Sequence, residues 1–330
     1  TIEKWTKHGG FRSLLKCALS QGIKITVLSK ENHVLKLEHG GEIIFIKGSN
    51  APVMRIMGNF TKNKELTKII LDDIGLRTPR GIVASSIKEI LRLVKKHEMP
   101  FPLILKPTHG SRALGVTWDI RSEQDLRDAF SVFEKIRKEH DLKESTVLVE
   151  EMFIGREYRV LVLNDQVISC VEKIPATITG DGKLSIKKLV AEFNKSRLPG
   201  FKIRLDTIAK ETIKNSGFTL NSVLPAKHVL KLRNNLNMSD GGRSIDVTSS
   251  MHQSFKDICI KSTNVIGLRF SGVDVISKDI SKQAKKSEYV ILELNPNPYY
   301  NMNEKPLVEG KGIDVSFLLL KQIFPHMRKI

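Results

Sequence analysis

The sequence predicts an α/β (α+β) protein, and three observations lead to this class. Apolar strand candidates alternate with amphipathic helix candidates along most of the chain, which favours α/β over an all-α or all-β class. The 330 residues are 40% hydrophobic and 27% charged, a composition that can build sizeable cores and is not typical of a disordered chain. One domain is compatible with this length, but two or three closely packed lobes fit it better.

The N-terminal residues have the pattern of a small βα unit. Apolar spacing predicts a helix over residues 11–19, and His39, Gly40 and Gly41 supply a hairpin turn between two later strands. The three strand candidates are residues 25–28, 33–38 and 42–47.

The middle of the chain alternates helices and strands. Gly75 and Pro79 end its first helix, and an apolar strand runs into the loop PTHGSRALG. The predicted helices are residues 63–74, 86–97 and 122–140, and the predicted strands are residues 102–106, 116–120 and 146–152.

The second half begins with two strands joined at the turn Asn164-Asp165 and ends with two more strands and a helix. Residues 195–235 show no clear period. The further predictions are helices over residues 181–193, 255–267 and 315–324, an extended piece over 243–250, and strands over 271–277 and 289–295.

The charge balance predicts a partner that carries negative charge. The chain has 54 Lys and Arg against 36 Asp and Glu, which gives a net charge of +18. A basic surface can serve DNA, RNA, acidic membranes, nucleotides and acidic metabolites alike. The sequence argues against nucleic acid, because it has no C2H2 spacing, no RNP-like motif and only 6% aromatic residues for base stacking.

The cysteines and the lack of long apolar stretches predict a soluble protein of the cytoplasm with no membrane partner. Cys17, Cys170 and Cys259 form no CxxC pair and are too few for a disulfide framework. No apolar run approaches the ~18 residues of a membrane span. The chain begins with Thr1, which is consistent with processing or with excision from something longer.

The sharpest chemical feature is a set of three oxygen-bearing side chains in two apolar strands. Asp274 lies in the middle of one strand, and Glu293 and Asn295, two apart on the other, point to the same face. Such oxygens suit a hard cation such as Mg²⁺. The alternative is that the carboxylates face solvent or pair with lysines.

Two other features are ambiguous by themselves. Lys106 closes a strand against a loop with Gly110, Ser111 and Gly115, which suits a phosphate, although an ordinary β-turn is the commoner explanation and the Walker spacing is absent. The acidic segment contains Glu150, Glu151 and Glu157, which suit an adenine amine and ribose hydroxyls or simply form an acidic surface loop. Lys64 and Lys173 taken singly are ordinary solvated lysines.

The order of these features along the chain resembles the ATP-grasp carboxylate-amine ligases. Within them the sequence is most similar to the ligase module of bifunctional glutathione synthetase and the ATP-grasp part of cyanophycin synthetase, over about residues 11–326. The segments that carry the resemblance are NKELTKIILDDIGLRTPRG, LILKPTHGSRALGVT, VLVEEMFIGREYRVLVLNDQVIS, KIPATITGDGKLSIKKLV, SDGGRSIDVT, IGLRFSGVDVI, ELNPNP and the closing helix with IFP.

The resemblance implies a role for each candidate residue. The nucleotide phosphates contact Lys64 and Lys106 under a lid that contains Gly110, Ser111 and Gly115. The adenine site is lined by Glu150, Glu151 and Phe153, and Glu157 bonds the ribose. The metal ligands, for Mg²⁺ or for Mn²⁺ in its place, are Asp274, Glu293 and Asn295. The basic side chains that are candidates for contacting the transferring phosphoryl group are Arg159, Lys173 and Arg243.

The resemblance also implies the lobes and the reaction. It implies a short N-terminal lobe over residues 1–56, a central lobe with the lid over 57–148 and a C-terminal lobe with the metal site over 149–330. The expected activity is ATP-dependent amide or peptide bond formation through an acyl phosphate, on small carboxylate and amine substrates that include acidic ones. Arg269 departs from the acidic residue common in relatives of the cyanophycin type and is expected beside the acceptor pocket.

Two alternatives remain beside this hypothesis. One is a ligase that modifies a protein tail, and the other is a non-catalytic nucleotide-binding or nucleic-acid-binding module that kept the fold. The sequence leaves open the acid, the amine, the product and whether the chain forms a homo-oligomer.

Overall fold

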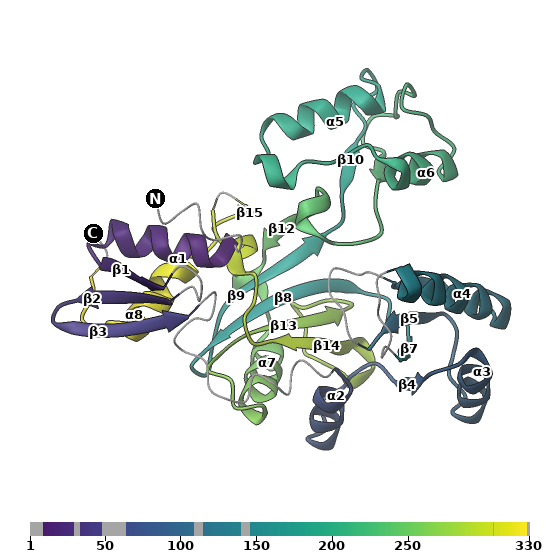
Figure 1. Cartoon of the computed structure of the whole chain (residues 1–330). Coiled ribbons are helices and arrows are strands. Elements are labelled where there is room, and N and C mark those ends of the chain that lie inside the picture. The colour runs from purple at the N-terminus through teal and green to yellow at the C-terminus, as the bar shows by residue number, and fades with distance from the viewer. Residues whose placement is uncertain are drawn as a thin grey trace. The chain divides into compact units, whose positions relative to one another are not determined.

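The computed structural model describes residues 9–29, 34–47, 64–108, 115–139, 146–305 and 307–328 (Figure 1). It contains both helices and mostly antiparallel sheets, so the predicted α/β (α+β) class is confirmed. The chain forms two compact units. The first comprises Thr1–Ile168, Ser249–Tyr299 and Ser316–Ile330, and the second comprises Ser169–Thr248 and Tyr300–Val315. The three-lobe division stays a prediction, and its last range, 149–330, is divided between both units.

The first unit begins with a helix and a small antiparallel sheet, as the sequence predicts. Gly40 and Gly41 have φ angles of 57° and 83°, the left-handed conformation that both central residues of a two-residue type I′ hairpin turn adopt. The elements are α1 Gly9–Ser20, β1 Lys24–Ser29, β2 Val34–His39 and β3 Glu42–Lys47, with the strand order β1-β2-β3.

The next part of the first unit is a four-stranded antiparallel sheet in the order β4-β7-β5-β6, with two helices packed against it (Figure 1). The Ser86 hydroxyl caps the first of these helices by accepting a hydrogen bond from the Glu89 N–H. Ile90, Leu103 and Leu126 are completely buried in their shared core. The elements are α2 Lys64–Asp73, β4 Gly81–Ala84, α3 Ile87–Lys96, β5 Leu103–Pro107, β6 Thr117–Ile120, α4 Glu123–Glu139 and β7 Val147–Glu151.

Three further strands of the first unit lie in the order β14-β13-β8, all antiparallel. The middle strand is buried along almost its whole length, which explains its apolar sequence. The elements are β8 Arg156–Leu163, α7 Gln253–Val265, β13 Phe270–Ser277, β14 Tyr289–Asn295 and α8 Val315–Ile323.

The second unit holds the strand order β9-β12-β15, a separate pair β10-β11 and two helices. One helix, α6, lies in the stretch for which the sequence shows no clear period. The elements of the second unit are β9 Gln166–Ile174, β10 Thr177–Thr179, α5 Ile186–Lys195, α6 Thr207–Asn215, β11 Val229–Lys231, β12 Arg243–Asp246 and β15 Val308–Glu309. Strand β9 starts before the unit boundary.

None of the helices in the described ranges combines the length and the apolar character needed to span a membrane.

Candidate functional site

The three predicted metal ligands lie together on one face of strands β13 and β14. Asp274 is directly opposite Glu293, and Gly272 is opposite Asn295, so the three side chains share a face. The Asn295 amide Nδ2 donates to Asp274 Oδ2 at 3.1 Å and to Glu293 Oε1 at 3.0 Å. Asp274 is only 3% exposed, so the solvent-facing alternative does not apply to it.

Arg159 joins this trio from the neighbouring strand β8. It lies opposite Asp274, and its Nε and Nη2 donate to Asp274 Oδ1 at 2.7 Å and Oδ2 at 2.8 Å. Burial alone would lower the pKa of the Arg159 guanidinium, but the charges of Asp274, Glu293 and Glu157 outweigh it and raise the pKa. Arg159 therefore stays charged and forms an ion pair with Asp274.

The donor set of the trio fits a hard cation. Among the described residues no group of three or more His, Cys, Asp and Glu side chains is placed to hold a metal ion, so a metal ion at the trio would take its third oxygen from the Asn295 amide. Two carboxylates and an amide are the oxygen ligands that Mg²⁺ takes. Asn295 presents its N–H₂ to both carboxylates here, and half a turn about its last side-chain bond would present its oxygen instead.

Gly272 makes the arrangement of Arg159 possible. A Cβ atom on Gly272 would lie 2.7 Å from Cβ of Pro298 and 3.0 Å from Cδ and Nη1 of Arg159. A side chain at this position would therefore force Pro298 or Arg159 to shift.

A second polar cluster surrounds Glu150, at the end of strand β7. Glu150 is 2% exposed, and its two carboxylate oxygens contact the ammonium groups of Lys68 and Lys106. Lys68 also donates to the carbonyl oxygen of Pro79 at 3.0 Å. From the sequence, Lys106 is expected at the phosphates and Glu150 at the adenine. In the structure the two residues belong to one buried group of ion pairs.

Glu151 extends this cluster with two arginines. Its Oε1 accepts hydrogen bonds from Arg77 Nη2 at 2.7 Å and from the Arg80 backbone N–H at 3.0 Å, and Oε2 lies 3.3 Å from Arg80 Nε. Burial alone would raise the pKa of Glu151, but the Arg80 hydrogen bonds and the Arg77 charge lower it. We call Lys68, Arg77, Arg80, Lys106, Glu150 and Glu151 the hinge cluster.

The hinge cluster contains three cations that the sequence analysis missed: Lys68, Arg77 and Arg80. The sequence contains a signal for Lys68, because it stands four residues after Lys64, the spacing at which helical residues are neighbours. Its distance of 82 residues from Glu150 hides the partner.

The remaining nucleotide candidates are placed only in part. Lys64 is the first residue of α2, and Phe153 and Glu157 are half-buried in and after the turn that enters β8. Gly115 has a φ of 71°, the left-handed conformation that favours glycine. Gly110 and Ser111 lie outside the described residues.

The other two basic candidates belong to the second unit and point away from each other. Lys173 on β9 is opposite Ser244 on β12, and Arg243 is opposite Ile174. Because neighbours along a strand face opposite sides, Lys173 and Arg243 lie on opposite faces of this pair. Arg243 contacts Glu309 instead, with Nη1 and Oε2 3.3 Å apart. The structure does not bring these two cations together.

Comparisons with known proteins find relatives of two kinds. No family model matches the sequence. The chain is 32% identical over 330 residues to the glutathione biosynthesis bifunctional protein GshAB of Enterococcus faecalis, covering 94% of this chain and 42% of that protein. It is 30% identical over 271 residues to cyanophycin synthetase of Trichormus variabilis, covering 80% of this chain and 29% of that protein.

A solved structure gives the same result. The crystal structure of a bifunctional glutathione synthetase from Pasteurella multocida matches 96% of this chain and 44% of its own chain, with a TM-score of 0.72 and 27% identity. The chain thus spans less than half of the length of each of these three relatives. They are the two kinds of protein that the sequence resembles, so that resemblance is confirmed.

Proposed function

We propose that this chain, a member of the ATP-grasp carboxylate-amine ligase family, catalyses ATP-dependent formation of an amide or peptide bond between a carboxylate and an amine. The observation that carries the proposal is the contact between Asp274, Glu293 and Asn295 on one sheet face. Carboxylates in apolar strands are costly to bury unless cations compensate them, and a metal ion held by these oxygens would act on Asp274 and Glu293 together, beside the pairing of Asp274 with Arg159.

The proposed reaction has two balanced steps. A carboxylate oxygen of the substrate attacks the γ-phosphorus of ATP, the bond to the bridging oxygen breaks, and ADP leaves. The amine then attacks the carbonyl carbon of the acyl phosphate, inorganic phosphate leaves, and the amine nitrogen loses a proton. The contribution of the protein is to position the groups and to neutralise charge.

In this proposal Asp274, Glu293 and Asn295 hold Mg²⁺. A bound Mg²⁺, for which Mn²⁺ is a substitute, would neutralise phosphate oxygens. Arg159 holds the Asp274 carboxylate in a fixed orientation with two hydrogen bonds, so we now assign it a positioning role instead of a phosphate contact.

The hinge cluster is proposed to receive the nucleotide. Its two carboxylates contact four cations, and such a group of cations suits a polyphosphate. Lys64, Phe153 and Glu157 and the lid residues Gly110, Ser111 and Gly115 keep their proposed nucleotide roles. Lys173 and Arg243 remain candidates for the phosphoryl group, but only one of them can act from a given face of their sheet.

No side-chain nucleophile is needed in this mechanism. Cys259 is completely buried, and burial raises the pKa of its thiol, so it stays neutral. The free cysteines Cys17, Cys170 and Cys259 fit our proposal that the chain works in the reducing cytoplasm. The excess of positive charge favours acidic substrates such as glutamyl or aspartyl compounds.

The test is ADP release with pairs of acids and amines. We expect release that requires both an acid and an amine, with an amide product detected by mass spectrometry. A panel of amino acids and dipeptides, acidic ones included, that gives no amine-dependent ADP would refute the small-substrate proposal. Release only with an acidic protein tail would favour the protein-modifying alternative, and salt-dependent binding of nucleic acid without Mg-ATP binding would favour the non-catalytic one.

A further inference from the structure

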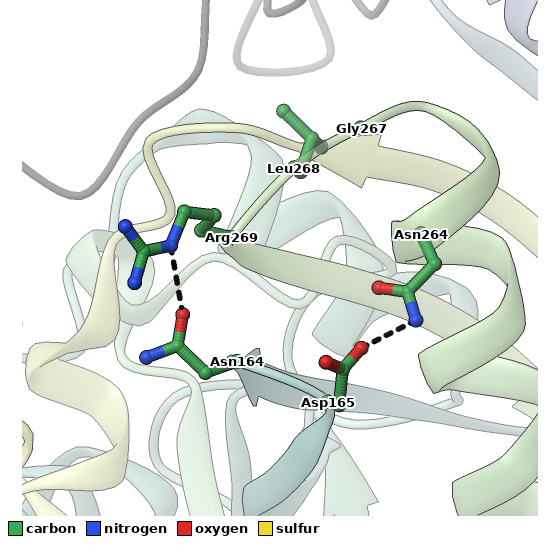
Figure 2. Close-up of a pocket in the computed structure, with 6 residues that line it drawn as sticks. All are labelled: Asn164, Asp165, Asn264, Gly267, Leu268 and Arg269. Atoms are coloured by element: carbon green, nitrogen blue, oxygen red, sulfur yellow. Dashed lines mark hydrogen bonds between the residues drawn. The ribbon is translucent and has the colours of Figure 1, made fainter.

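A pocket of about 670 Å³ lies in the first unit at the β8–β9 turn, and the proposed function does not use it (Figure 2). It is formed where this turn meets the end of α7 and the start of β13. The lining residues are Asn164, Asp165, Asn264, Gly267, Leu268 and Arg269. We call this the turn pocket.

The turn pocket is separate from the carboxylate trio. Arg269 directly precedes β13, and Asp274 follows five residues later on that strand. At ~3.3 Å per residue the two Cα atoms are roughly 16 Å apart. The expectation that Arg269 flanks the acceptor pocket stays a prediction, which this distance from Asp274 does not test.

The pocket holds one positive and one negative side chain, each fixed by an asparagine. Arg269 Nε donates to Asn164 Oδ1 at 3.0 Å, and the Asn164 backbone N–H donates to the Arg269 carbonyl oxygen at 2.8 Å. The Asn264 amide donates to Asp165 Oδ1. Figure 2 shows these two bonded pairs side by side, with Asn164 beneath Arg269 and Asp165 beside Asn264.

Arg269 and Asp165 are both exposed, and neither forms an ion pair with any residue in the described ranges. Their asparagine partners are neutral, so the full charge of each group remains for a ligand. Single charged side chains on a protein surface are common. Here, however, hydrogen bonds orient both the Arg269 guanidinium and the Asp165 carboxylate within one pocket. The site is thus electrically complementary to a molecule with two opposite charges.

The backbone around the pocket keeps the two charges in place. Asn164 and Asp165 have φ angles of 43° and 63°, the left-handed pair of a tight hairpin turn, which Asn and Asp tolerate. Helix α7 ends beside Asp165, and the partial negative charge of a helix C-terminus favours a cation on this side.

We propose that the turn pocket binds a small zwitterion, a free amino acid or a short peptide, whose carboxylate contacts Arg269 and whose ammonium contacts Asp165. A dianion or a nucleotide fits less well, because Asp165 would repel a second negative charge and no lining residue is aromatic. Leu268 is 3% exposed and Gly267 has no side chain, so the pocket selects for the charged ends more than for the side chain of the ligand.

Calorimetry without ATP tests the proposal with four probes: L-alanine, L-alanyl-L-alanine, N-acetyl-L-alanine and L-alaninamide. The last two each lack one charge. We expect at least one of the two zwitterions to bind with a Kd on the order of 1 mM. Each blocked probe should bind roughly tenfold more weakly, the usual effect of losing one charged hydrogen bond.

Two substitutions locate the binding. Arg269→Gln should weaken the binding of the zwitterions roughly tenfold, because their carboxylate then has no partner. The zwitterions should then bind no more tightly than L-alaninamide, which lacks that carboxylate. Asp165→Asn should remove their advantage over N-acetyl-L-alanine, and asparagine keeps the left-handed turn.

The matched controls are Arg121→Gln and Asp257→Asn. Arg121 is an exposed arginine far from the pocket in sequence, and Asp257 accepts an amide hydrogen bond from Gln253 at 2.8 Å on the same helix α7. Both controls should bind the zwitterions as the unchanged chain does.

Three results would overturn the proposal: no heat from either zwitterion, equal binding of the blocked probes, or unchanged binding in both pocket variants. The last would place amino-acid binding elsewhere, for example at the proposed ligase site. The ADP-release assay judges the ligase activity separately, so either proposal can fail alone.

Discussion

The carboxylate trio and the hinge cluster are polar groups of the first unit that each contain two carboxylates, but the cations beside them differ. In the trio the guanidinium of Arg159 is paired with Asp274, and in the hinge cluster Glu150 and Glu151 contact two lysines and two arginines. Carboxylate and amide oxygens suit a metal ion, and a group of cations suits phosphates. We therefore propose that each cluster contacts a different part of a metal-bound nucleotide.

The largest expected effect is on catalysis by the trio. Glu293→Gln should reduce turnover by about 100-fold or more, because a neutral amide holds a divalent cation less strongly than a carboxylate does. Glu293 is only half-buried, so the melting temperature should change by no more than about 2 °C. Glu211→Gln, an exposed change on α6, is the control for ADP release and melting. Full activity of Glu293→Gln would remove the metal from our proposal.

The next effect is on stability, and it belongs to the hinge cluster. Glu150→Gln would leave the ammonium groups of Lys68 and Lys106 together in a buried place, at a cost of about 3 kcal/mol in the free energy of unfolding. Urea denaturation measures this cost. Glu134→Gln breaks only the surface pair with Arg137 and should cost less than ~1 kcal/mol. Equal costs for the two variants would show that the lysines do not depend on Glu150.

A smaller effect should link stability and catalysis at Gly272. Gly272→Ala brings a methyl group against Pro298 and Arg159, and we expect a loss of about 2 kcal/mol together with slower turnover as Arg159 moves from Asp274. Gly200→Ala is the matched control, since apart from its own residue and its two chain neighbours no heavy atom lies within 4 Å of the added methyl group. Normal stability and turnover of the Gly272→Ala variant would show that a methyl group at this position does not collide with Pro298 and Arg159.

The smallest effect is the pH dependence of Glu151. Its folded-state pKa is lowered from the usual value near 4.5, so its contribution to stability is present above about pH 4.5 and is lost as the pH falls through the lower folded value. Glu151→Gln should cost ~1 kcal/mol at pH 7. Unfolding in urea at pH 7 and at pH 3 measures whether this cost shrinks in acid; a constant cost would argue against the paired carboxylate.

Local patterns were enough to predict most of the fold and the trio. Glu293 and Asn295 are two apart on one strand, and an acidic residue in an apolar strand is visible without knowing its neighbours. The partner of Asp274 was not visible, because Arg159 is 115 residues away and only the pairing of β8 with β13 brings it close. The same holds for Lys68 and Glu150.

Helix α6 was missed for a local reason. Ala209 and Ile213 are buried and four apart, as a helix requires, but Ile208 is 59% exposed and obscures the apolar stripe. The capping residue was a better signal for this helix than the apolar spacing. The Asp206 carboxylate accepts a hydrogen bond from the Ala209 N–H at 3.1 Å.

The segment after α2 connects the two sheets between which the nucleotide is proposed to bind. The Ile291 N–H on β14 donates to the Arg77 carbonyl oxygen at 2.8 Å, and Lys261 Nζ on α7 donates to that of Ile74 at 2.8 Å. Any opening or closing of the β4–β7 sheet against β13 and β14 must therefore break these bonds or pivot about residues 74–77.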